Sequence, residues 1–167
     1  GRFAGPQSIA VDMEGAIALP AFTDMHTHLD KGHIWGRSPN PDGTFAGALD
    51  AVAKDRAANW TAEDVRRRME FSLRCAYAHG TARIRTHLDS QPPQDDITWP
   101  VFRELQAEWA GRIALQAVCL IGCDKWTDDD GPFGHTADLV AATKGSVLGM
   151  VTYEMDDLRD RIRGFLY

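Results

Sequence analysis

The sequence of 167 residues predicts an α/β fold in which parallel strands alternate with helices. Short stretches with a hydrophobic period of two alternate along the chain with longer stretches of helical period. One of the short stretches is apolar almost throughout, which is typical of a parallel strand buried on both faces. Because a chain of this length can bury one substantial core, we expect a single domain.

The first βα unit begins with a strand expected over Phe22–His28, where alternate side chains share a face. A loop rich in glycine and proline follows, and a helix is expected over Thr44–Ala58. Thr61 suits the N-cap of the next helix, and Gly80 suits the left-handed position after its end.

The same plan then repeats toward the C-terminus. Further strands are expected over Thr81–Asp89, over the apolar stretch Ile113–Ile121, and over Ser146–Thr152. Further helices are expected over Thr98–Trp109, over His135–Thr143, and from Asp156 toward Tyr167.

These four βα units are compatible with a doubly wound sheet or with a barrel. The glycine-rich fingerprint of a dinucleotide-binding fold does not follow the first strand. An eight-stranded barrel typically needs about 250 residues, and half a barrel alone would expose two parallel strand edges. The pattern therefore indicates an incomplete α/β fold.

The composition narrows the classes of partner. Lys and Arg number 18 against 24 Asp and Glu, a net charge of −6 without basic clusters, so nucleic acid and membrane are not expected as partners. No apolar run approaches about 18 residues, and the N-terminus does not resemble a signal peptide. Cys75, Cys119 and Cys123 are expected to be reduced thiols in a cytoplasmic protein. A homo-oligomer is left open.

The pair His26 and His28 is the sharpest chemical feature. Residues i and i+2 of a strand project to the same side, so both imidazoles can bind one metal ion. The pair ends a predicted strand, at the edge of the sheet where barrel enzymes keep their sites. The alternative is two surface histidines on an edge strand.

Other polar residues near the strand ends have two interpretations each. Asp24 could orient a metal ligand or form an ordinary salt bridge. His87 could line a substrate pocket or hydrogen-bond a metal-bound group, or it could be a buried histidine satisfied by Asp89 or Arg85. The remaining histidines are expected to be solvated: His33, His79 and His135.

The segment from Leu19 to Lys31, with the His-x-His pair inside it, resembles the beginning of the barrel in the amidohydrolase superfamily. Three later segments, Asn40–Phe45, Arg74–Thr81 and Ile84–Ser90, are similar to its cytosine deaminase branch. The resemblance implies a metal-dependent (β/α)8 barrel flanked by a small β-sandwich. Residues 1–19 would be a remnant of that sandwich and a lead-in, and residues 20–167 the first half of the barrel.

The resemblance also implies roles for particular residues. His26 and His28 would be the first two ligands of one divalent ion, zinc or iron. The remaining ligands and the catalytic acid/base group would lie outside this sequence. A bridging lysine at the end of the fourth strand is absent from Gly149–Tyr153, which favours a single metal ion. The glutamine that cytosine-specific members place after the third strand is absent from Leu120–Cys123.

The leading hypothesis for function is hydrolytic deamination of a small, cytosine-like nitrogen heterocycle by metal-activated water. Lys31, Trp35, His87 and Asp89 are the candidates for lining the substrate pocket. One alternative is hydrolysis of another C–N bond, such as that of a cyclic ureide. Another is a catalytically incomplete fragment or interaction module, because two ligands do not make a competent site.

Overall fold

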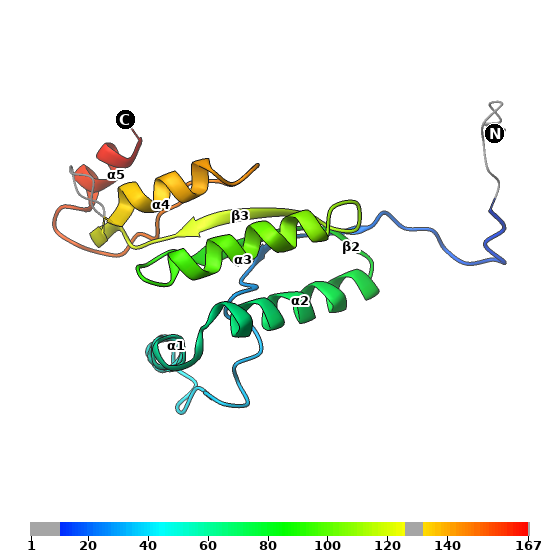
Figure 1. Ribbon diagram of the computed structural model, residues 1–167, viewed down its shortest axis with the longest axis horizontal. Coiled ribbons are helices and arrows are strands. Elements are labelled where there is room, and N and C mark those ends of the chain that lie inside the picture. The colour runs from blue at the N-terminus through cyan, green and yellow to red at the C-terminus, as the bar shows by residue number, and fades with distance from the viewer. Residues whose placement is uncertain (1–10, 126–131, 167) are drawn as a thin grey trace.

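The computed structural model describes residues 11–125 and 132–166 (Figure 1). Its elements follow in the order β1 (Phe22–Thr27), α1 (Phe45–Asn59), α2 (Ala62–Ala78), β2 (Thr81–Asp89), α3 (Asp95–Glu108), β3 (Ala114–Leu120), a short 3-10 turn (Cys123–Lys125), α4 (Pro132–Ala141) and α5 (Leu158–Leu166). None of the helices in the described part combines the length and the apolar character needed to span a bilayer.

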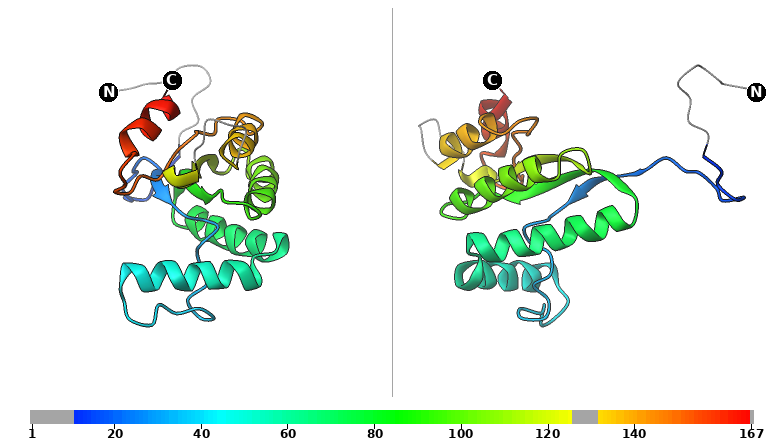
Figure 2. Two further views of the ribbon diagram at one scale, coloured as in Figure 1. Left: turned by 90° about the vertical axis from the view of Figure 1, so that its left-hand side faces the viewer. Right: turned by 45° about the vertical axis from the view of Figure 1, so that its right-hand side comes forward.

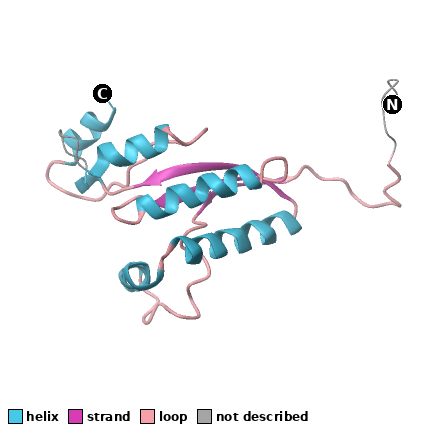
Figure 3. Ribbon diagram, in the orientation of Figure 1, coloured by secondary structure: helices cyan, strands magenta, loops and turns pink. Residues whose placement is uncertain are grey.

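A parallel sheet with the strand order β1-β2-β3 forms the centre of the molecule (Figure 3). The pairing of β2 with β3 is regular from Arg83 opposite Ala114 to Asp89 opposite Leu120. The pairing of β1 with β2 is interrupted after Phe22 and again between Asp24 and Thr27. The predicted α/β class with a parallel sheet is therefore confirmed.

The fourth predicted strand, Ser146–Thr152, is not a continuous strand. Only two isolated parallel bridges form, Val147 with Val118 and Val151 with Gly122. The residues between Val147 and Val151 form no bridge with the neighbouring segment. Gly149 lies in this interruption, where an added Cβ would come within 2.6 Å of the Cys119 carbonyl oxygen. The close approach explains why a glycine occupies this position.

In the described part of the chain, the helices packed on the sheet cover one of its faces (Figure 2). The core between them joins Ile84 and Leu88 of β2 to Met69 and Leu73 of α2 and to Phe102 of α3. The expectation that β3 is buried on both faces is wrong, because burial alternates along it. Leu115, Ala117 and Cys119 face the helices and are buried, whereas Gln116 and Val118 on the opposite face are only partly covered.

Side-chain caps fix where the first two helices begin. The hydroxyl of Thr44 accepts a hydrogen bond from the Gly47 amide at 2.9 Å, and that of Thr61 accepts one from the Asp64 amide at 3.2 Å. The third helix begins at Asp95, three residues before the expected start, so Pro100 lies inside it. Pro100 has no backbone N–H to donate. The helix nevertheless continues through it, because the buried Trp99 and Phe102 anchor this turn in the core.

The segment before β1 has no strand among its described residues, 11–19, and its apolar side chains Val11, Ile17 and Leu19 are exposed. Residues 1–10 lie outside the described part of the chain. The assignment of residues 1–19 to a sandwich remnant therefore stays a prediction.

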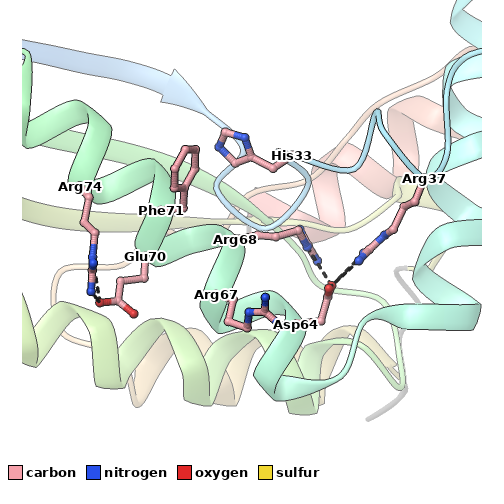
Figure 4. Close-up of a pocket in the computed structure, with 8 residues that line it drawn as sticks. All are labelled: His33, Arg37, Asp64, Arg67, Arg68, Glu70, Phe71 and Arg74. Carbon is pink, nitrogen blue, oxygen red and sulfur yellow. Dashed lines mark hydrogen bonds and ion pairs between the residues drawn. The ribbon is translucent and has the colours of Figure 1, made fainter.

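A network of charged side chains holds the loop after β1 against α1 and α2 (Figure 4). Arg37 donates hydrogen bonds to Asp55 at 2.7 and 2.8 Å and to Asp64 at 2.6 and 2.9 Å. Asp64 also accepts one from Arg68 at 2.8 Å, and Arg68 reaches the carbonyl oxygens of Asp30 and Gly32. The same network therefore fixes the backbone two residues beyond the His-x-His pair.

A pocket of about 570 Å³ opens beside this network, between His33 of the loop and α2 (Figure 4). Most of its charged groups are paired with each other, as Arg74 is with Glu70 at 2.7 Å and Arg37 and Arg68 are with Asp64, whereas Arg67 has no ion pair in the described part. None of the predicted site residues lines it. We therefore interpret this pocket as a consequence of the loop's attachment.

We predict that Asp64→Asn lowers the free energy of unfolding by about 1–2 kcal/mol at pH 7. Hydrogen bonds from Arg37 lower the pKa of Asp64 from 3.8 to about 2. A carboxylate whose pKa is lower in the folded chain stabilises the fold above its unfolded pKa, and this contribution is lost as the pH falls toward 2. Urea denaturation of both proteins between pH 2 and pH 7 measures the difference.

The control is Asp50→Asn, which removes an exposed pair with Lys54 and should change stability by less than about 0.5 kcal/mol. Equal stability of Asp64→Asn and the unsubstituted protein at pH 7 would contradict the assignment.

Candidate metal centre

Three histidines meet where β1 and β2 end. The ring centroids of His26 and His28 are 5.3 Å apart, and His87 lies 4.0 Å from His26 and 5.7 Å from His28. His26 and His87 are stacked, with an interplanar angle of 22°. The parallel pairing of the strands places their carboxyl ends at one edge, so the structure brings the His-x-His pair and His87 together.

The His28 ring is held in one orientation by the backbone of the neighbouring strand. Its Nδ1 lies 3.0 Å from the carbonyl oxygen of His87, and because a carbonyl only accepts, Nδ1 must donate the hydrogen. Nε2 of the neutral ring then carries a free lone pair. A backbone carbonyl on the other ring nitrogen is the usual support of a metal-binding histidine.

The sequence left open whether His87 is satisfied by Asp89 or Arg85, and the structure shows it paired with neither. Asp89 is bound by Lys31 at 2.7 Å and by Arg56 at 2.5 Å, and Arg85 donates to the Gln116 side chain at 2.6 Å. Among the described residues, the buried Nδ1 of His87 has no hydrogen-bond partner. His87 therefore keeps a polar atom that a bound molecule could use.

Burial favours the neutral form of two of the three imidazoles. It lowers the pKa of His28, and it lowers the pKa of His87 together with the neighbouring rings of His26 and His28. Only a neutral imidazole can bind a metal ion. The oriented ring of His28, its free Nε2 and the adjacent His26 are compatible with a divalent ion, and their role as metal ligands stays a prediction.

Side-chain hydrogen bonds continue the contact between the two strands beyond the end of β1. The buried Thr86 hydroxyl accepts from the Leu29 amide at 3.0 Å, and Asp30 accepts from the Asp89 amide at 2.7 Å. Together with the bond from His28 to His87, they tie residues 28–30 to the end of β2. We call these three bonds the seam.

Asp30 is the most deeply buried acid of the seam. Burial, with the nearby charge of Asp89, raises the pKa of Asp30 to about 7. Asp89, by contrast, is bound by two cationic side chains. The two carboxyl groups therefore differ in their surroundings: burial favours the protonated form of Asp30, whereas Asp89 forms two ion pairs.

The other predicted pocket residues are not all brought together. Lys31 and Asp89 form an ion pair close to the histidines. The side chain of Trp35 is 68% exposed on the loop and makes no hydrogen bond or ring contact with the other candidates in the described part. Asp24 accepts a hydrogen bond from the His26 backbone amide at 3.1 Å, so it positions the backbone and not the ring.

Sequence reasoning missed a second group of potential metal ligands. Asp95, Asp96 and His135 place their ligand atoms within 4.8 Å of one another. His135 is exposed, as expected, and its Nε2 lies 2.9 Å from Asp96 Oδ1. The three residues lie on two different helices, so no motif spacing within one helix could have indicated this group.

No protein-family model matches the chain. The chain is 56% identical over 149 residues to the pterin deaminase of Rhizobium rhizogenes. The aligned region covers 88% of this chain and 33% of that protein. The chain thus spans about a third of the length of the curated relative.

Solved structures with a similar fold include a protein named as a deaminase and one named as an aminohydrolase. The 5-methylcytosine deaminase of Klebsiella pneumoniae matches 95% of this chain and 49% of its own, with a TM-score of 0.62 and 20% identity. N-isopropylammelide isopropylaminohydrolase of Burkholderia multivorans matches 87% of this chain and 37% of its own, with a TM-score of 0.63 and 27% identity.

The parallel α/β fold of this chain is thus similar to that of part of these two enzymes. Together with the sequence match, these similarities support the resemblance to the deaminase branch of the amidohydrolase superfamily.

We predict that Thr86→Val destabilises the fold by about 1–3 kcal/mol, because the buried Leu29 amide loses its acceptor. Thr86→Ser keeps the hydroxyl and should cost about 1 kcal/mol or less. Urea denaturation measures the stability, and hydrogen exchange of the Leu29 amide reports the seam directly. If the two variants unfold alike and that amide exchanges at the same rate in both, the seam does not have the role assigned to it.

Proposed function

We propose that this chain supplies part of the active site of a metal-dependent enzyme that hydrolytically deaminates a nitrogen heterocycle. The observation that carries the proposal is the edge formed by His26, His28 and His87, with one ring fixed so that its Nε2 is free. The 56% identity to a protein named pterin deaminase supports it independently.

His26 and His28 would hold the ion in this proposal. When bound, a zinc or iron ion supplies the Lewis acidity that activates water near neutral pH. His28 is pre-oriented for this task by the His87 carbonyl, so little conformational freedom is lost on binding. His87 itself would present its unpaired Nδ1 to the substrate or to water beside the ion.

Lys31, Asp89 and Trp35 are proposed to border the substrate. Asp89 is held by Lys31 and Arg56 with both carboxylate oxygens occupied, so it would act as a fixed acceptor and not as a proton carrier. Trp35, exposed on a loop anchored through Arg37, offers an aromatic surface for a flat ring.

For the substrate we propose an amino-substituted ring of the pterin type as the first to test. This replaces the narrower cytosine-like expectation, which rested on a branch whose cytosine-specific glutamine this sequence does not have at the expected position. The reaction would consume one water molecule, exchange the ring C–NH2 for C=O and release ammonia. Release of ammonia without ring opening distinguishes it from hydrolysis of a cyclic ureide.

The catalytic test uses the full-length polypeptide that carries this sequence, identified by its intact mass. A mass above that of 167 residues would allow the remaining ligands to be supplied by the same chain. A mass equal to it would favour the alternative of a catalytically incomplete fragment, unless a second chain completes the site.

We predict that His26→Ala combined with His28→Ala removes the ion of this site and lowers ammonia release from pterin by at least about 1,000-fold, because metal-assisted activation of water is lost. Metal analysis of the purified protein and an ammonia assay give the two readouts. His79→Ala is the matched control, since His79 binds only the carbonyl of Cys75 on its own helix. Unchanged metal content and turnover in the double variant would show that the assignment is wrong.

A further inference from the structure

A second group of ligand atoms lies between α3 and α4. Asp95 and Asp96 occupy the first turn of α3, and His135 occupies the beginning of α4. The Nε2 of His135 lies 2.9 Å from Asp96 Oδ1 and 3.8 Å from Asp95 Oδ2. All three ligand atoms lie within 4.8 Å of one another.

The buried Asp95 provides an independent observation. Its side chain is completely buried, and its Oδ1 accepts from the Asp96 amide at 3.0 Å. Its Oδ2 has no hydrogen-bond partner among the described residues, and the distance to His135 is too long for a hydrogen bond. A buried carboxylate oxygen without a partner is costly, so a cation bound beside His135 and Asp96 would satisfy this atom.

We propose that Asp95, Asp96 and His135 bind a divalent transition-metal ion of the zinc type. Around a tetrahedral ion with bonds of about 2.0–2.1 Å, neighbouring ligand atoms are roughly 3.3 Å apart. The distances of 2.9 and 3.8 Å lie on either side of that value, so small side-chain movements suffice. The imidazole nitrogen selects zinc-type ions over Ca²⁺ and Mg²⁺, which prefer oxygen ligands only.

The ion would join two helices that already share an anchor. The Trp99 indole of α3 donates to the Ser90 hydroxyl at 3.0 Å, and the Thr136 hydroxyl of α4 donates to the Ser90 carbonyl at 3.2 Å. Both helices are therefore hydrogen-bonded to Ser90, the residue that follows β2. A metal bridge between their first turns would lock α4 onto α3, and it involves none of the histidines at the strand ends.

The test is calorimetric titration of the metal-free, full-length polypeptide with ZnCl₂. His26→Gln with His28→Gln is used as the background, so that the strand-end histidines contribute nothing. We expect about one zinc ion per chain to remain bound in this background. Adding His135→Gln or Asp96→Asn should weaken it by at least about 100-fold, whereas adding His79→Gln should not change it. CaCl₂ at the same concentration should give no binding heat.

His135 and Asp96 are exposed positions, so these variants are expected to fold, which circular dichroism verifies. Zinc should raise the Tm of the background protein and leave that of the His135→Gln protein unchanged. Loss of all zinc in the background, or zinc binding unaffected by His135→Gln and Asp96→Asn, overturns the proposal and leaves an ordinary ion pair. Deaminase activity plays no part in these readouts, so a failure of the proposed function would be seen separately.

Discussion

The seam between residues 28–30 and the end of β2 is the constraint on which the candidate site depends. The backbone ladder of β1 ends at Thr27, one residue before His28. Beyond that point the two segments are held by side chains, through the bonds of His28, Thr86 and Asp30. Without them, His28 would lie at the start of an irregular loop and could not keep a fixed position relative to His26 and His87. Arg68 of α2 secures the same segment from the other side through the Asp30 carbonyl.

The two faces of the sheet differ because alternate side chains of β2 point to opposite sides. The side chains of Ile84, Thr86 and Leu88 turn toward the helices and are buried. Their neighbours Arg85 and His87 turn to the face that no helix of the described part covers. Because successive residues of a strand alternate, the packing that orients the core also orients His87 toward His26. The core and the site are thus two consequences of one strand register.

The sequence predicted those features that depend on local pattern. The bounds of β2 coincide with the expected Thr81–Asp89, the cap of Thr61 lies where it was expected, and the first helix begins one residue after the expected Thr44. Features that depend on contacts distant in sequence were not predicted. Alternation of apolar residues could not show that the chain at Gly149 passes too close to Cys119 for a regular ladder. Likewise, the pairing of His135 with Asp96 arises only from the packing of α4 on α3, and neither helix carries a sign of it alone.

The two proposed metal sites differ in the charged groups that surround the ion. A histidine binds a metal ion as a neutral imidazole, Asp89 is already paired with Lys31 and Arg56, and burial favours the protonated form of Asp30. A divalent cation placed there gains no compensating negative charge from these residues, so a stable site needs an anionic group from elsewhere in the protein. The group between α3 and α4 contains two carboxyl groups beside His135, and burial raises the pKa of Asp95, which favours its protonated form until a cation binds. As proposed, this group would supply negative charge to its ion directly, whereas the histidine edge would be a partial site with open coordination positions.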